Sequence, residues 1–361
     1  MQKESRIETV LILQGGGSLG AYECGVYKTL AKNGIKFDVV AGTSIGAVNA
    51  AIIAGTKNND PVNDLESFWL TVAERITPSF LPDNMRAIWT STYSAIWGNP
   101  NVFTPKWMTL TPDFFLPHTW PYLYDIAPLK NTLNEYVDFA KLGDSNRPRL
   151  IVTSTDIQKG EAVTFDSKHA KIDADHVLAS AGYPFYGISW TQLDGRYLWD
   201  GSLLSNTPLR EVIDASPTCD KRVYIVNLFP SIQEKPPENL SEAWHRARDI
   251  MHTDKTEHNV KMSKAFSRYL ELLKEMHEVM MYFLDNAQVN ETIRKKIMKI
   301  EPEYHKLAIQ RGAIIKEIIR IERKEDSPFL FEDADFSLAT IKQLIEQGEE
   351  DARKVLAKKT A

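Results

Sequence analysis

The alternation of short apolar strands with helical segments restricts the fold of this chain more than any other feature. Runs rich in β-branched residues predict strands at Thr9–Leu13, Val39–Val40, Leu150–Thr155, Ala162–Phe165, Tyr197–Trp199 and Val223–Leu228. The first two runs are followed by helical patterns, from about Ala21 to Lys32 and then through Ala54. Apolar strands that alternate with helices predict a largely parallel sheet covered on both faces. We therefore expect a doubly wound, three-layer α/β/α core.

The second part of the chain has a different character. Charged residues become denser after about residue 230, and the sequence Lys235-Pro236-Pro237-Glu238 marks a boundary there. We predict an α/β domain over residues 5–230 and a mostly helical extension over 231–361. The segment 262–284 has helical apolar spacing and is expected to pack on the core or on a partner, with membrane contact as the alternative. The run Ile314–Ile321 is ambiguous, and its isoleucines favour an added strand.

Composition narrows the class of protein. A chain of 361 residues with 43% hydrophobic residues can bury a large core, and a net charge of −5 gives no attraction to polyanions. We expect no nucleic-acid partner. Two cysteines, Cys24 and Cys219, cannot form a disulfide framework and fit a reducing compartment. The first residues lack the apolar run of a secretory signal, and no run is long enough to span a membrane, so we expect a cytoplasmic protein, at most peripheral to a membrane.

A first candidate catalytic motif is Gly42-Thr43-Ser44-Ile45-Gly46, which lies between a predicted strand and an alanine-rich helix. A tight strand-to-helix turn exposes a serine to an approaching carbonyl, and the flanking glycines allow close packing around it. The alternative is that Ser44 simply caps the helix.

A second motif, Gln14-Gly15-Gly16-Gly17-Ser18-Leu19-Gly20, follows the first strand. Unobstructed backbone N–H groups after a strand suit an oxyanion hole. Gly15, Gly17 and Gly20 also satisfy a dinucleotide-binding pattern. That interpretation needs an acidic residue at the far end of the next strand, and Asp38 instead precedes this strand.

A third motif, Trp199-Asp200-Gly201-Ser202, places a carboxylate at the end of a predicted strand. It can reach the same sheet edge as Ser44, although an aspartate before glycine is also common in ordinary turns. None of the eight histidines lies in a strand-end loop with glycine neighbours. A serine nucleophile without histidine still needs a base, which a carboxylate in a dry cleft can supply.

Together these residues resemble the patatin-like phospholipases. Four blocks match the signatures of that family in order, over roughly residues 8–212: Gly15–Gly20, Gly42–Gly46, Ala179-Ser180-Ala181-Gly182-Tyr183-Pro184 and Asp200-Gly201-Ser202. Many members carry a basic residue where this chain has Leu19, which puts recognition of a phosphate headgroup in question. The segment Asp335-Phe336-Ser337 resembles the C-terminal extension of a bacterial subgroup.

The resemblance implies a serine carboxylic-ester hydrolase that acts on phospholipid or another lipid ester. Ser44 would be the nucleophile, Asp200 the base, and the amides of Gly15, Gly16 and Gly17 the oxyanion hole. Gly20, Gly42, Gly46 and Gly201 would support these motifs. No metal or cofactor is implied, and the oligomeric state stays open.

Two other functions remain under consideration: an esterase, thioesterase or polyester hydrolase on a different acyl substrate, and a nucleotide-binding or non-catalytic scaffold protein. The insert 89–124 is rich in aromatic side chains, which predict an acyl-chain groove, a membrane-facing lid or a small core of its own. These side chains are Trp89, Tyr93, Trp97, Phe103, Trp107, Phe114, Phe115, Trp120, Tyr122 and Tyr124.

Overall fold

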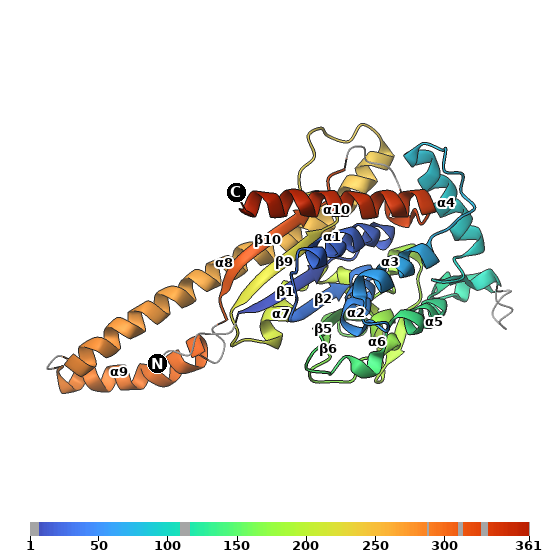
Figure 1. The fold of residues 1–361 in the computed structure, drawn as a ribbon. Coiled ribbons are helices and arrows are strands. Elements are labelled where there is room, and N and C mark those ends of the chain that lie inside the picture. The colour runs from blue at the N-terminus through green and yellow to red at the C-terminus, as the bar shows by residue number, and fades with distance from the viewer. Residues whose placement is uncertain (1–6, 109–115, 287–288, 310–312, 326–330, 361) are drawn as a thin grey trace.

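The fold is built on a mixed sheet enclosed by helices (Figure 1). The computed structural model describes residues 7–108, 116–286, 289–309, 313–325 and 331–360. Within these residues an eight-stranded sheet has the order β10-β9-β1-β2-β5-β8-β7, with β6 paired to β5. Its strands are β1 (Glu8–Leu13), β2 (Val39–Thr43), β5 (Arg149–Asp156), β6 (Glu161–Asp166), β7 (Thr191–Leu193), β8 (Arg196–Asp200), β9 (Lys221–Asn227) and β10 (Ile315–Glu322). Every strand predicted from the sequence is present in this sheet.

Strand direction explains why the candidate motifs meet. The strands β10, β9, β1, β2 and β5 are parallel, so the ends of β1 and β2 point to the same edge of the sheet. Strand β8 runs antiparallel to β5 and pairs Asp200 with Ser154. The short strands β3 (Thr104–Pro105) and β4 (Tyr124–Asp125) form a separate antiparallel pair in the aromatic insert.

Helices cover both faces of the sheet (Figure 1). The helices of the described residues are α1 (Gly20–Lys32), α2 (Ile45–Gly55), α3 (Pro61–Val72), α4 (Asp83–Trp97), α5 (Ala127–Tyr136), α6 (Ala174–Leu178), α7 (Leu209–Ala215), α8 (Leu240–Asn286), α9 (Glu291–Tyr304) and α10 (Leu338–Thr360). Of these, α9 and much of α8 extend beyond the sheet (Figure 1). Side chains of β1 alternate between the layers: Leu11 and Leu13 pack with α1, α2 and α10, whereas Val10 and Ile12 pack with α7 and Val260 of α8. This arrangement confirms the α/β/α core with a mostly helical C-terminal region.

The C-terminal region contributes to the core. Strand β10 extends the sheet beside β9, which confirms the strand predicted at Ile314–Ile321. Helix α10 crosses α1 closely: a Cβ on Gly25 would lie 1.9 Å from the carbonyl oxygen of Ile345, and a Cβ on Gly348 would lie 2.1 Å from that of Tyr22. Our division into residues 5–230 and 231–361 stays a prediction.

Helices α8 and α9 form a hairpin that extends away from the rest of the molecule (Figure 1). The expectation that segment 262–284 packs on the core is wrong for most of its apolar side chains, since Met262, Phe266, Tyr269 and Met276 are exposed. In the residues that the structure describes, no helix is both long enough and apolar enough to cross a bilayer.

Candidate active site

Ser44 occupies the turn between β2 and α2. Its backbone has φ 56° and ψ −128°, a conformation that a residue with a side chain rarely adopts. Neighbouring backbone leaves no room for side chains on either flank: a Cβ on Gly42 would lie 2.1 Å from the carbonyl oxygen of Gly46, and one on Gly46 would lie 2.4 Å from that of Leu13. The glycines therefore permit a strained turn that lifts Ser44 from the sheet edge.

The third sequence block stabilises this turn. The N–H of Ser44 donates to Oγ of Ser180 at 2.8 Å, and the Ser180 hydroxyl donates to the carbonyl oxygen of Thr153 at 2.5 Å. The Thr43 hydroxyl also donates, to the carbonyl oxygen of Ser205 at 2.8 Å. These bonds tie the strained residue to β5 and offset its conformational cost.

The glycine loop lies against the Ser44 turn. A Cβ on Gly15 would lie 2.8 Å from Cβ of Ser44, so the two segments touch. The N–H of Gly15 donates to Oδ1 of Asn206 at 3.0 Å. Across the described residues, the N–H groups of Gly16 and Gly17 have no recorded acceptor. Both glycine amides are therefore available to a ligand.

Asp200 ends β8 with 1% of its surface exposed. Its Oδ1 accepts the N–H of Ser202 at 2.8 Å, whereas Oδ2 is buried without a hydrogen-bond partner among the described residues. Burial raises the pKa of Asp200 to about 6, although the hydroxyl of Ser44 and the amide of Ser202 act in the opposite direction. A Cβ on Gly201 would lie 2.4 Å from the carbonyl oxygen of Thr153, so glycine lets this turn approach β5. Asp200 is therefore a carboxylate of unusual basicity.

Ser44, Asp200 and the three loop glycines line one cavity of about 390 Å³. The rest of its wall is mainly apolar and includes Val48 of α2, Leu129 of α5 and Phe103 of the aromatic insert. Phe103 packs edge-on against Tyr124, another lining residue, with ring centroids 5.2 Å apart. The insert thus contributes to the cavity wall. Its Phe114 and Phe115 lie outside the described residues.

Motif-supporting Gly20 packs behind the loop, where a Cβ would lie 2.7 Å from Ile45. The adjacent Leu19 is buried in the core with 1% exposure. It therefore offers nothing to a headgroup.

The C-terminal region also reaches the glycine loop, which sequence reasoning missed. The contact is made by the short 3-10 helix η8 (Glu332–Ala334). The Ser18 hydroxyl donates a hydrogen bond to the carbonyl oxygen of Glu332 at 2.9 Å. A Cβ on Gly17, whose φ is 56°, would lie 2.1 Å from the carbonyl oxygen of Asp333. The Tyr186 hydroxyl donates to Oδ2 of Asp333 at 2.7 Å. In the sequence, only the neighbouring segment Asp335-Phe336-Ser337 points to this region, and its resemblance to a C-terminal extension predicts no contact with the glycine loop.

A buried ion-pair cluster joins η8 to α8. The guanidinium of Arg248 lies 2.9 Å from carboxylate oxygens of both Glu332 and Asp333 and 3.0 Å from Asp249. Arg323 adds a contact of 2.8 Å to Glu332. Although burial acts against it, Arg323 and Arg248 hold the pKa of Glu332 below its usual value. The cluster therefore fixes η8, and with it the cover of the glycine loop.

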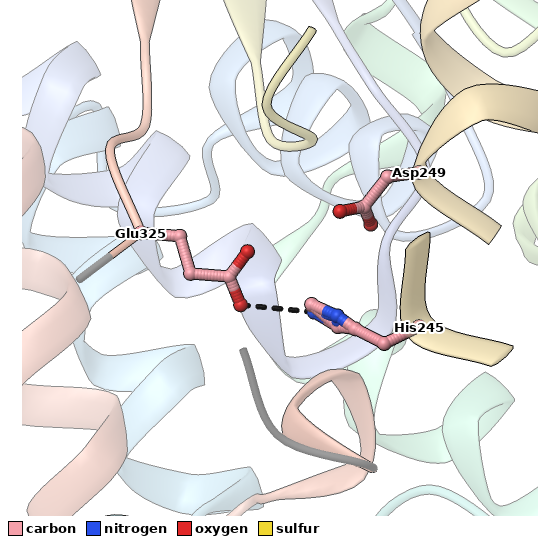
Figure 2. Close-up of side chains that lie close together, drawn as sticks. All are labelled: His245, Asp249 and Glu325. Carbon is pink, nitrogen blue, oxygen red and sulfur yellow. Dashed lines mark ion pairs between the residues drawn. The ribbon is translucent and has the colours of Figure 1, made fainter. Parts of the chain in front are cut away.

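His245, Asp249 and Glu325 lie within this cluster and could hold a metal ion, because their donor atoms fall within 4.8 Å of one another (Figure 2). His245 Nε2 contacts Glu325 Oε1 at 2.9 Å, but the guanidinium of Arg248 also lies 2.9 Å from this nitrogen. Burial and the nearby Glu332 raise the pKa of Glu325, which favours its neutral carboxyl form over a negatively charged metal ligand. These contacts favour an ion-pair cluster over a metal site.

One histidine lies close to the candidate site. His252 lines the cavity and stacks on Phe229 with ring centroids 4.8 Å apart. It is the only histidine among the described residues that form the cavity wall. No motif in the sequence singles out His252.

Comparisons with known proteins agree with this architecture. The sequence model of the family described as patatin-like phospholipase matches residues 11–213, more than half of the chain. The chain belongs to the patatin-like phospholipase family. This result confirms the resemblance found from the four sequence blocks.

Individual patatin-like relatives match over short segments. The chain is 50% identical over 44 residues to lysophospholipase nte1 of Aspergillus terreus, covering 12% of this chain and 3% of that protein. It is 44% identical over 50 residues to triacylglycerol lipase SDP1L of Arabidopsis thaliana, covering 14% and 6%. The crystal structure of VipD from Legionella pneumophila aligns with 98% of this chain and 67% of that chain, at 14% identity and a TM-score of 0.38. That likeness is too low to carry an argument.

Proposed function

We propose that this patatin-like protein hydrolyses lipid acyl esters with Ser44 as nucleophile and Asp200 as general base. Family membership supports lipid acyl hydrolase activity. The observation that carries the finer assignment is that a strained, half-buried serine shares an apolar cavity with a buried carboxylate of raised pKa. A pKa near 6 leaves Asp200 charged at neutral pH and more basic than an ordinary aspartate.

In the proposed first step, Oγ of Ser44 attacks the acyl carbonyl carbon and its proton passes to Asp200. The amides of Gly16 and Gly17 stabilise the oxyanion, while Gly15 positions the loop through its bond to Asn206. When the tetrahedral intermediate collapses, the alcohol leaves with the proton from Asp200. Ser44 is then esterified by the acyl group.

In the second step, Asp200 accepts a proton from water as the water attacks the acyl-enzyme. Collapse of the second intermediate releases the fatty acid, and the proton returns to Oγ of Ser44. No metal or cofactor takes part in either step. The apolar wall of the cavity suits the acyl chain, whereas a nucleotide would need partners for its sugar and base.

Covalent labelling tests the nucleophile. An alkyl fluorophosphonate should add once per chain, and peptide mapping should place the adduct on Ser44. Ser44→Ala should abolish both the adduct and hydrolysis, whereas Ser202→Ala, at a neighbouring serine of the same cavity, should still be labelled. An adduct on another serine would show that the nucleophile is misassigned.

A substrate panel separates this proposal from its alternatives. Phospholipids, triacylglycerol, acyl thioesters and a polyester film should be compared with wild type and Ser44→Ala. We expect the fastest turnover on a lipid ester. If a thioester or polyester is turned over fastest, the Ser44–Asp200 dyad would still be supported, but the substrate would not be a lipid ester. Thermal stabilisation by nucleotides, with no turnover of any ester, would favour the binding-protein alternative.

A further inference from the structure

Helix α4 buries polar side chains and exposes apolar ones. Its buried residues include Arg86, Thr90 and Ser94, whereas its exposed residues are mostly large and apolar. Surface helices normally bury the apolar side and expose the polar one. The exposed apolar set, which we call the α4 face, consists of Met85, Ile88, Trp89, Ile96 and Trp97, with exposed fractions of 49% to 59%.

Polar contacts hold α4 in this orientation. The Arg86 guanidinium donates to the carbonyl oxygen of Leu81 at 2.9 Å and to Oδ1 of Asp83 at 2.7 Å. The hydroxyls of Thr90 and Thr77 lie 2.8 Å apart. Because the buried Arg86 and Thr90 side chains are paired in this way, turning the apolar side of α4 inward would leave them without these partners. The exposure of the α4 face is therefore built into the fold.

The α4 face adjoins the mouth of the cavity. Ser91, Thr92, Ser94 and Ala95 line the cavity, and Thr92 is also exposed on the outer side of the helix. The cavity wall therefore reaches the surface at the α4 face. Tyr186, another lining residue, is 38% exposed, and the adjacent Phe185 is 72% exposed.

We propose that the α4 face docks on the surface of an uncharged lipid bilayer and opens the cavity towards its acyl chains. The proposal rests on the proposed function, since a membrane lipid must pass from the bilayer to Ser44. No charged side chain is exposed from Met85 to Trp97, so the face complements neither an anionic surface nor a charged protein. Tryptophan side chains such as Trp89 and Trp97 favour the boundary between lipid and water.

The opposite end of the molecule provides a matched control. The α8–α9 hairpin also exposes large apolar side chains, but lysine and glutamate residues lie among them, and the hairpin extends far from α4 (Figure 1). Phe266 and Tyr269 of α8 are 60% and 65% exposed, against 55% for both Ile88 and Trp89. Replacing Ile88 and Trp89 by serine therefore removes about as much exposed apolar surface as replacing Phe266 and Tyr269.

Vesicle flotation with the full chain tests the proposal. We expect wild type to bind phosphatidylcholine vesicles with little change between low and high salt. The double variant Ile88→Ser/Trp89→Ser should bind about tenfold or more weakly, because apolar burial drives the docking. The control Phe266→Ser/Tyr269→Ser should bind as wild type does. Thermal melts should show that both variants are folded, and Trp97→Ser is a second probe of the same face.

Activity measurements separate this proposal from the dyad. Ile88→Ser/Trp89→Ser should hydrolyse a soluble short-chain ester within about twofold of wild type, because these residues do not line the cavity. Ser44→Ala should bind vesicles normally and hydrolyse nothing. If wild type binds vesicles through α4 but cleaves no ester, the proposed function fails and the docking surface stands.

Three results would overturn the docking surface. The first is unchanged vesicle binding by the α4 variants. The second is loss of binding in the α8 control alone, or in high salt. The third is a wild-type dimer that ignores vesicles and becomes monomeric with Ile88→Ser/Trp89→Ser, which would show that a second copy covers the face.

Discussion

Replacing Asp200 by Asn should remove activity and yet stabilise the fold at neutral pH. Folding raises the pKa of this carboxyl group from 3.8 to about 6 because the group is buried. A raised pKa means that the folded state binds the proton more tightly than the unfolded state. The free energy of unfolding therefore falls as the pH rises between those two pKa values. Above the folded-state pKa the full destabilisation by the buried charge is present. Two pKa units correspond to about 3 kcal/mol, an upper estimate for the gain in Asp200→Asn.

The gain should depend on pH in a defined direction. At pH 7 the variant avoids the buried charge, so its melting temperature should exceed that of wild type by a few degrees. Near pH 4 the folded wild type already carries the proton, and the two proteins should melt at similar temperatures. The Asn amide keeps an oxygen for the N–H of Ser202, which limits the loss of hydrogen bonding.

Differential scanning fluorimetry across pH 4 to 8, paired with ester hydrolysis, checks this reasoning. Asp194→Asn is a matched control, because Asp194 is exposed and its positive φ tolerates Asn. We expect that variant to remain active and to melt with wild type at every pH. If Asp200→Asn is less stable than wild type at pH 7, burial of the Asp200 charge does not destabilise the fold. If the variant keeps normal turnover, Asp200 is not the base.

Four further outcomes follow from the site. Ser44→Gly should be inactive but more stable by about 1 kcal/mol in a thermal melt, because glycine accepts a φ of 56° without strain. His252→Ala should keep ester turnover within about tenfold, since the proposed base is Asp200; a dead but folded variant would point to a histidine mechanism. Arg248→Met should lower the free energy of unfolding by about 3–5 kcal/mol, because buried carboxylates lose their cation, and Arg248→Lys should recover part of this in chemical denaturation. Hydrolysis of a soluble ester should survive EDTA, and a loss restored by one divalent ion would contradict a metal-free dyad.

Local patterns were enough to predict most of the α/β core. The strand at Val39 and the glycines around Ser44 report on their own neighbourhood, since a parallel strand followed by a tight turn leaves a signature within a few residues. Strand β10 is also predicted from local sequence, because its isoleucines are typical of a strand within a sheet. The family match confirms that these local patterns add up to a patatin-like domain.

Contacts between distant segments could not be predicted in this way. The η8 segment meets Gly17 and Ser18 across more than 300 residues of chain, and no local pattern encodes that pairing. The prediction that residues 262–284 of α8 pack on the core was wrong for a different reason. Its apolar side chains have the spacing of a packed helix, but nothing in that spacing states whether a partner surface exists within the same chain. The roles of Ser44, Asp200 and the loop glycines stay predictions.

The position of β10, η8 and α10 late in the chain bears on how the protein is made. As the polypeptide leaves the ribosome, β1 to β9 emerge well before these segments, and β9 then has an unpaired edge. The glycine loop also lacks its cover from Asp333 at that stage. We expect the nascent chain to need protection from aggregation until α10 crosses α1.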